Sequence, residues 1–207
     1  MIGVIDYGAG NLRSVLNAFI ALGQTPFVIQ KPSELVRASG VVLPGVGAFG
    51  KGMAKLKHMS LIEPLNEAVL VQKKPFLGIC LGLQFLASVS REQGEHKGLG
   101  WLNGTVEAIV PSSSRHRIPH MGWNNVALER TTPLFKGISE TPTFFFVHSY
   151  ELVLERDDSR FVTSTCDHGT TIISSVQKEN IFGVQFHPEK SHRHGKALLG
   201  NFLGMGA

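Results

Sequence analysis

The first eighty residues alternate between short, continuously apolar runs and segments with the spacing of an amphipathic helix. The apolar runs, each the length of a strand, span residues 2–7, 25–30, 41–43 and 75–80. Helical spacing is carried by Leu12, Val15, Leu16 and Phe19, and a longer helix is predicted over residues 50–72. Apolar strands separated by helices predict a parallel sheet that is covered by helices on both faces.

The second half of the chain has a different pattern, in which strand-like segments follow one another closely. These segments span residues 105–110, 143–152, 161–166, 170–177 and 181–186. Short turns such as His168-Gly169 join several of them, which predicts an antiparallel extension of the sheet. A helix over residues 196–203 follows. Because the sequence shows neither repeats nor a linker, we expect one α/β domain over residues 1–207, with a mostly parallel sheet flanked by helices.

The composition excludes several classes of protein. With 43% hydrophobic and 17% charged residues, the chain has the profile of a folded globular protein and not of a disordered one. Its formal net charge is +4, but the densest basic cluster is the short Arg115-His116-Arg117. A nucleic-acid-binding stripe would be longer and interleaved with aromatic residues. We therefore interpret the charge as a solvated surface or a preference for small anionic molecules.

The sequence also predicts a cytoplasmic protein without a metal site. Its first residues lack the basic and apolar regions of a signal peptide. No apolar run approaches the ~20 residues that cross a bilayer. Cys80 and Cys166 lie 86 positions apart, a spacing that fits neither a metal site nor a disulfide framework.

Cys80 stands between two glycines where a predicted strand meets a predicted helix, in Gly78-Ile79-Cys80-Leu81-Gly82. This is the pattern of a nucleophile elbow with cysteine in the usual serine position. So sharp a turn holds its central residue in a strained conformation, and flanking side chains would collide across it. We expect the sulfur to project into solvent above the carboxyl ends of the strands, with the helix N-terminus favouring the thiolate. The alternative is a buried structural cysteine.

A nucleophilic thiol needs a base, and the base needs a group that orients it. Residues 186–191, Phe-His-Pro-Glu-Lys-Ser, supply both directly after the last predicted strand. Pro188 restricts His187 to an extended backbone, and Glu189 then lies within reach of the imidazole. A histidine before proline is more often an ordinary loop residue, but together with the elbow it predicts a catalytic group.

The motifs GICLGLQ and GVQFHPEKS resemble those of the class I glutamine amidotransferases, whose catalytic triad is Cys-His-Glu. DYGAGN, LPGVGAFG, PHMGWNNV and FFFVHSY resemble, more narrowly, the glutaminase subunits of imidazole glycerol phosphate synthases within that family. The likeness extends from Ile2 to about Phe202. It implies a flavodoxin-like sheet and a two-step acyl transfer in which Cys80 attacks the amide of glutamine, His187 moves protons and Glu189 orients His187.

The resemblance also implies groups that stabilise the oxyanion and bind glutamine. The oxyanion donors would be the backbone N–H of Leu81 and the Val46–Gly47 peptide in Pro44-Gly45-Val46-Gly47, whose two glycines around Val46 would let that peptide flip. A plain strand-ending turn is the competing interpretation of that segment. The residues implied in substrate binding are Gly45, Gln84, His148, Ser149 and Tyr150. For Gln84, an ordinary surface residue is an equally good interpretation.

No second active site is evident in the sequence, so the released ammonia needs an acceptor on another protein. The resemblance implies a HisF-type cyclase subunit as partner in a heterodimer, glutamine as substrate, and no cofactor, nucleic acid or membrane. The residues that match interface positions are Asn11, Arg13, Trp123 and Lys190. His192 and His194 have no nearby carboxylate or cysteine, and we expect them to be solvated residues of a loop rather than metal ligands.

Two other functions remain open. A paralogue would keep the same chemistry and supply ammonia to a different synthase, such as one that amidinates surface sugars. A non-catalytic module on the same fold would usually lack a triad member, and all three are present here.

Overall fold

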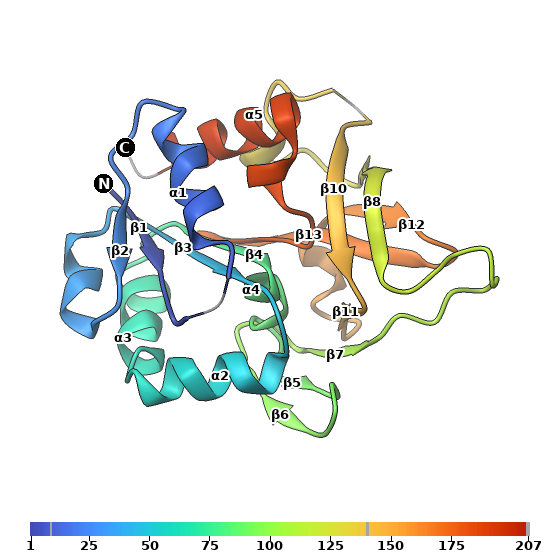
Figure 1. The fold of residues 1–207 in the computed structure, drawn as a ribbon, viewed down its shortest axis with the longest axis horizontal. Helices are drawn as coiled ribbons and strands as arrows, with labels where there is room; N and C mark the ends of the chain where they lie inside the picture. Colours follow the sequence, from blue (N-terminus) through green and yellow to red (C-terminus); the bar gives the residue numbers. More distant parts are fainter. Residues whose placement is uncertain (9, 140, 206–207) are drawn as a thin grey trace.

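A mixed sheet passes through the centre of the molecule (Figure 1). Within residues 1–8, 10–139 and 141–205, which the computed structural model describes, it has eight strands. Ala9 of the DYGAGN motif lies outside these residues. In sheet order the strands are β2 (Phe27–Ile29), β1 (Ile2–Ile5), β3 (Gly40–Gly45), β4 (Phe76–Cys80), β14 (Ile181–Val184), β13 (Thr171–Lys178), β12 (Val162–Asp167) and β9 (Ala127–Leu128).

The first five strands in that order are parallel and the last three are antiparallel. The predicted mostly parallel sheet with an antiparallel extension is therefore confirmed. The segment over residues 181–186, which its sequence pattern places with the antiparallel extension, is a central strand. β14 pairs in parallel with β4 on one side and antiparallel with β13 on the other.

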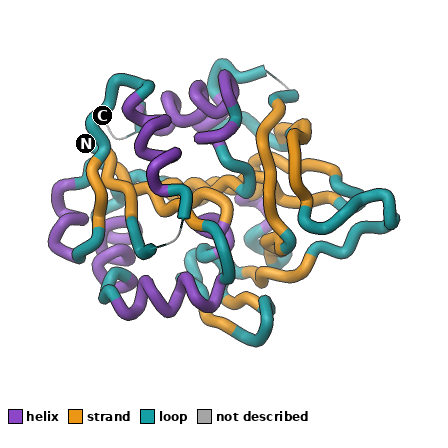
Figure 2. The backbone as a smooth tube through the Cα atoms, viewed as in Figure 1, coloured by secondary structure: helices purple, strands orange, loops and turns teal. Residues whose placement is uncertain are grey.

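Helices cover both faces of the parallel part, as predicted (Figures 1 and 2). On one face, α1 (Leu12–Ile20) and α5 (His192–Leu203) pack over a core that includes Val42 and Ile79. On the other, α2 (Phe49–His58) and α3 (Ile62–Asn66) pack over a core that includes Val41. Neighbouring residues of one strand enter opposite cores because side chains alternate across a sheet. None of the helices among the described residues is both long and apolar enough to span a membrane.

Two smaller sheets flank the central one. The antiparallel pair is β8 (His120–Asn125) with β10 (Thr143–His148). The other sheet has the order β11 (Tyr150–Leu154), β7 (Gly104–Ala108), β5 (Val89–Ser90) and β6 (His96–Lys97). The single strand predicted over residues 143–152 is therefore wrong: the chain leaves one sheet at His148 and enters another at Tyr150. Ser149 marks the crossing, and its carbonyl accepts a hydrogen bond from the N–H of Ile109.

The long helix predicted over residues 50–72 is also divided. It ends at His58, and Ser60 takes a φ of 54° before α3 begins. The remainder after α3 is a π-helical turn, Glu67–Val71. The break lets Leu56 and Leu61 both enter the core, which one straight helix would not allow. Shorter helical segments are α4 (Leu81–Gln84) and the 3₁₀ turns Pro32–Arg37, Pro133–Phe135, Ser159–Phe161 and Pro188–Lys190.

Gly195 lets α5 approach the chain just before it. A Cβ at this position would lie 1.8 Å from the backbone oxygen of Pro188. We expect Gly195→Ala to lower the free energy of unfolding by about 3 kcal/mol, because the backbone of residues 188–190 must move. Gly200→Ala in the same helix is the matched control, since its Cβ would have only ordinary contact, at 3.8 Å from Leu22. That variant should gain about 0.5–1 kcal/mol in urea unfolding. Equal effects of the two substitutions would contradict this account.

Candidate active site

Cys80 occupies the sharp turn between β4 and α4. Its backbone has a φ of 55° and a ψ of −106°, which non-glycine residues rarely adopt. A Cβ on Gly78 would lie 2.5 Å from the carbonyl oxygen of Gly82, and a Cβ on Gly82 would lie 1.8 Å from that of Leu43. The crowding predicted for the two glycines is therefore confirmed, and it involves the neighbouring strand as well as the turn itself.

The Cys80 sulfur does not project into open solvent, and this part of the prediction is wrong. The residue is 6% exposed and lines a cavity of about 310 Å³. Cys80 lies against Val147 of β10 and against Gln185, which follows β14. The Cys80 Sγ lies 3.9 Å from the carbonyl oxygen of Val147 and 3.6 Å from Nε2 of Gln185.

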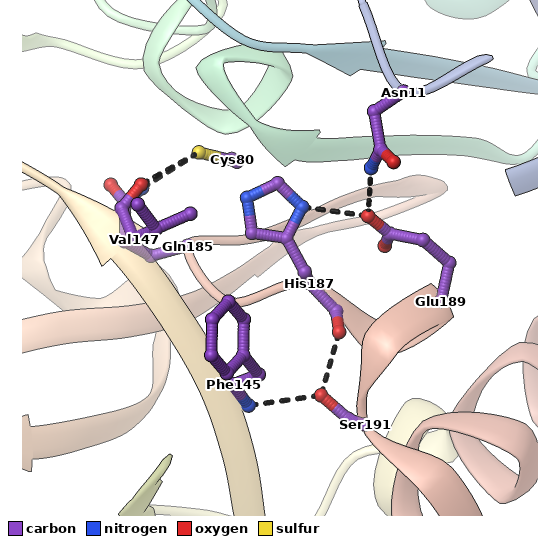
Figure 3. A network of polar contacts seen from close by, with 8 residues as sticks. All are labelled: Asn11, Cys80, Phe145, Val147, Gln185, His187, Glu189 and Ser191. Carbon is purple, nitrogen blue, oxygen red and sulfur yellow. Dashed lines mark hydrogen bonds and ion pairs between the residues drawn. The ribbon is translucent and has the colours of Figure 1, made fainter. Parts of the chain in front are cut away.

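The His187 imidazole lies between Cys80 and Glu189 (Figure 3). Its Nδ1 is 2.7 Å from Oε1 of Glu189, and both side chains are almost completely buried. The backbone of His187 is extended before Pro188, with a φ of −101° and a ψ of 93°, as predicted. The structure thus brings together the three residues predicted to be catalytic, in the order thiol, imidazole and carboxylate.

The backbone of His187 is held from two sides. Its N–H donates to the carbonyl of Phe145 in β10 at 2.8 Å. Its carbonyl accepts from the hydroxyl of Ser191 at 2.6 Å, and that same hydroxyl oxygen accepts from the N–H of Phe145 at 3.0 Å (Figure 3). These bonds fix the position of the imidazole relative to β10, which forms a wall of the cavity.

The charges at this site favour a protonated imidazole. Burial by itself lowers the pKa of His187, but the neighbouring Cys80 and Glu189 outweigh burial and raise the pKa above its usual range. Within the described residues, Nε2 of the ring is buried without a hydrogen-bond partner. A ring that holds a proton beside the Cys80 sulfur, with a carboxylate behind it, can give that proton to a leaving group and, once neutral, take one from water.

Most of the residues predicted to bind glutamine and the oxyanion line this cavity. It is lined by Val46, Gly47, Cys80, Leu81, Gln84, Glu92, Val147, His148, Ser149 and Tyr150. Gly47 has a φ of 99°, and a Cβ built there would meet no atom within 4 Å. Gly45 lies behind the cavity wall: it pairs with Cys80 across β3 and β4, and the hydroxyl of Tyr7 would be 2.2 Å from a Cβ at this position.

Gln84 is buried, so its interpretation as a surface residue is wrong. Its Nε2 donates to the carbonyl of Tyr150 at 2.9 Å and to Oε1 of Gln185 at 3.1 Å. Both amide hydrogens are therefore used inside the protein, and Gln84 can offer a substrate only its oxygen. Gln185 in turn points its own Nε2 toward Cys80.

Three residues of the site were missed from the sequence. Gln185 is a lone polar residue in an apolar strand-like run, which was the available signal. Glu92 comes from the loop between β5 and β6, and its carboxylate accepts from the N–H of Phe49 at the start of α2 at 2.6 Å. Val147 contributes through its backbone oxygen. Neither of these two positions carries a signal in the sequence, because each depends on how the smaller sheets pack.

Residues 3–205 match the glutamine amidotransferase class-I family. The chain belongs to the class I glutamine amidotransferases. Solved structures of two glutamine amidotransferases have the same fold. One has a TM-score of 0.75 at 18% identity and covers 99% of this chain and 98% of its own. The other, from Thermotoga maritima, has a TM-score of 0.66 at 21% identity and covers 99% and 82%.

Several relatives of higher identity carry one name, imidazole glycerol phosphate synthase subunit HisH. The relative from Pelagibacter ubique is 41% identical over 206 residues, which cover 98% of each chain. The relative from Desulfitobacterium hafniense (strain DSM 10664 / DCB-2) is 46% identical over 202 residues, or 98% of this chain and 93% of its own. A HisH 2 from Pseudomonas aeruginosa is 40% identical, with 98% coverage of both.

In this class I amidotransferase, a chain of directional hydrogen bonds leads away from the cavity. His148 Nδ1 donates to the carbonyl of Tyr150 at 2.9 Å, so its Nε2 is left to accept from His120 Nδ1, also at 2.9 Å. His120 Nε2 then accepts from Nδ2 of Asn124 at 3.2 Å. The same amide donates to the carbonyl of Asp167 at 2.8 Å. Each ring has a single tautomer that satisfies this order.

Both imidazoles of this chain are kept neutral. Burial lowers the pKa of His148 to about 4, although its bond to Tyr150 opposes the shift. Burial and the neighbouring His148 and His168 lower the pKa of His120 to about 3. His120 also stacks on Phe146, with ring centroids 4.6 Å apart. A second proton on either ring would turn an accepting nitrogen into a donor that faces another donor. The hydrogen-bond chain therefore requires both histidines to be neutral.

The residues predicted at a partner interface fall into two groups. Trp123 is 49% exposed and stacks on His192 at 5.1 Å, and Lys190 lies over the ring of Phe145 at 5.8 Å. Arg13 is exposed on α1. Asn11 instead turns its side chain toward Glu189 (Figure 3). The loop expected at His192 and His194 is wrong, because both lie in the first turn of α5. His192 is exposed, as expected, whereas His194 is half-buried with its Nδ1 3.1 Å from the backbone of Thr143.

The histidine chain should make the protein sensitive to acid. Because the folded pKa values of His120 and His148 lie below the unfolded value near 6.5, unfolded chains bind more protons, and stability falls as the pH drops below 6.5. Between pH 7 and pH 5, we expect His120→Asn to lose roughly 1 kcal/mol less than the wild type in urea unfolding. The exposed His58→Asn is the control and should behave as the wild type. An unchanged pH dependence in His120→Asn would contradict the assignment.

Proposed function

We propose that this chain is the glutaminase subunit of an imidazole glycerol phosphate synthase. The observation that carries the proposal is the Cys80–His187–Glu189 arrangement at the edge of an amino-acid-sized cavity. The relatives named as HisH subunits of that synthase support it, because they match the chain over 98% of its length. We place the activity in the cytoplasm, where glutamine is available.

In the proposed reaction, the Cys80 sulfur attacks the side-chain amide carbon of glutamine and forms a tetrahedral oxyanion. His187 gives its proton to the nitrogen, the C–N bond breaks, and ammonia leaves a glutamyl thioester. Water then attacks the thioester while His187 accepts its proton, and glutamate leaves with Cys80 restored. Glu189 keeps His187 oriented throughout. The backbone N–H of Leu81 and the Val46–Gly47 segment would stabilise the oxyanion.

We further propose that the ammonia passes to a HisF-type cyclase subunit in a heterodimer. The cyclase would use it on a phosphoribulosyl formimino carboxamide ribonucleotide, giving imidazole glycerol phosphate and an aminoimidazole carboxamide ribonucleotide. Exposed Trp123 is the strongest candidate for an interface anchor, since a half-exposed Trp stacked on another ring is preorganised for contact. Arg13 and Lys190 would add positive charges to the same interface.

A second function is kept because some relatives carry numbered names, HisH 1 and HisH 2. A numbered copy is compatible with a paralogue that supplies ammonia to another synthase, such as one acting on a surface sugar. The triad and cavity would be the same in both cases. The two functions differ in which synthase stimulates the chain.

Glutamate release from glutamine tests the proposal directly. We expect little release by the chain alone and at least about a 100-fold rise with a HisF-type cyclase and its nucleotide ligand together. Cys80→Ala should abolish the release, because no thioester can form. Cys80-dependent glutamate release that the cyclase does not stimulate would favour the paralogue. Absence of any Cys80-dependent release, even with the cyclase, would revive a non-catalytic module.

Gly47 tests the oxyanion segment. With a φ of 99° and no atom near its Cβ position, Gly47→Val would be strained by the backbone alone and not by contacts. We expect it to remain folded but to lose stimulated turnover by roughly 100-fold or more, since one oxyanion donor is misplaced. Gly23→Ala, also at positive φ with open space, is the control and should keep full turnover. Undiminished stimulation in Gly47→Val would contradict the role of this segment.

A further inference from the structure

Asn11 has an unusual position for a residue that begins a helix. It precedes α1 with a φ of 78°, in the left-handed region that asparagine tolerates better than most residues. An asparagine at this point normally accepts a hydrogen bond from the first turn of the helix. Within the described residues of α1, the Asn11 side chain makes no such bond. Its Nδ2 instead donates to Oε1 of Glu189, which is 178 positions away in the sequence (Figure 3).

The carboxylate of Glu189 is held through one oxygen. Oε1 accepts from both Asn11 Nδ2 and His187 Nδ1, whereas Oε2 is buried without a partner among the described residues. The Glu189 side chain is 0% exposed, so the carboxylate has no contact with bulk solvent. Without Asn11, the carboxylate would be fixed only by the imidazole that it is meant to orient.

We propose that Asn11 is a positioning residue of the triad: it fixes the Glu189 carboxylate so that Glu189 can hold the His187 ring toward Cys80. The inference rests on the proposed glutaminase function. It also explains the residue type. Glycine would keep the backbone but offer no donor, and aspartate would keep the backbone but place a second carboxylate beside Glu189. Only an amide meets both requirements at this position with a side chain of this length.

Two substitutions at Asn11 separate the side chain from the backbone. In Asn11→Gly, with saturating HisF-type cyclase and its ligand, we expect kcat to fall roughly 10–100-fold with KM within about twofold, because the glutamine cavity is untouched. In Asn11→Asp, the aspartate can donate to Glu189 only when it is protonated. The ratio of its kcat to that of the wild type should therefore rise as the pH is lowered.

Ser60→Gly is the matched control, since it also introduces glycine at a positive φ, 54°, but on the exposed segment after α2. It should keep the wild-type kcat. A readout independent of activity is the solvent exchange of the His187 Nδ1 proton, followed by NMR. We expect faster exchange in Asn11→Gly and no change in Ser60→Gly, with urea unfolding showing that all variants are folded.

The outcomes distinguish this inference from the proposed function. A wild type without partner-stimulated glutamate release would overturn the function, whereas the NMR result still decides the role of Asn11. Unchanged exchange and kcat in Asn11→Gly would overturn the inference alone. So would losses in Asn11→Gly and Asn11→Asp that are equal at every pH, because these indicate only an anchored loop. If Asn11→Gly changed only the concentration of cyclase that gives half-maximal stimulation, Asn11 would be an interface residue, and the inference would also be overturned.

Discussion

The position of the Cys80 thiol depends on how closely the backbone packs where β4 turns into α4. Gly82 brings α4 against β3 so tightly that any side chain there would overlap the Leu43 carbonyl, and Gly78 leaves room for the same turn. This contact holds Cys80 in its positive-φ conformation. Once the sulfur is fixed, the imidazole and carboxylate have to reach it from elsewhere, and β14, β10 and α5 are arranged to bring His187 there.

Much of the central fold was predictable because parallel strands buried on both faces leave continuous apolar runs in the sequence. The same reasoning failed for residues 143–152, since their composition is uniformly strand-like and only tertiary packing makes the chain change sheets at Ser149. It failed for β14 in another way. The sequence of a strand does not indicate which strands it pairs with. β14, which has one parallel and one antiparallel partner, therefore has the same pattern as a strand of an antiparallel meander.

The candidate site was predictable where chemistry constrains residue type within a short stretch, as it does around Cys80 and from His187 to Glu189. It was not predictable where contacts join distant segments: Asn11 meets Glu189 because α1 packs beside the turn after β14, and no local pattern reports that. The histidines illustrate the same limit. His187 is kept charged by its neighbours while His120 is kept neutral by burial, although both are single histidines in motif-like stretches.

The placement of β14 has a consequence for how the chain folds. During synthesis β4 and β13 both emerge before β14, and until it arrives each has an unpaired edge that is prone to wrong pairing. Its insertion closes both edges at once, a step that joins segments far apart in the sequence and is therefore slow. Because His187 follows β14 directly, the same step delivers the imidazole to Cys80. The pairing that completes the sheet therefore also completes the thiol–imidazole pair.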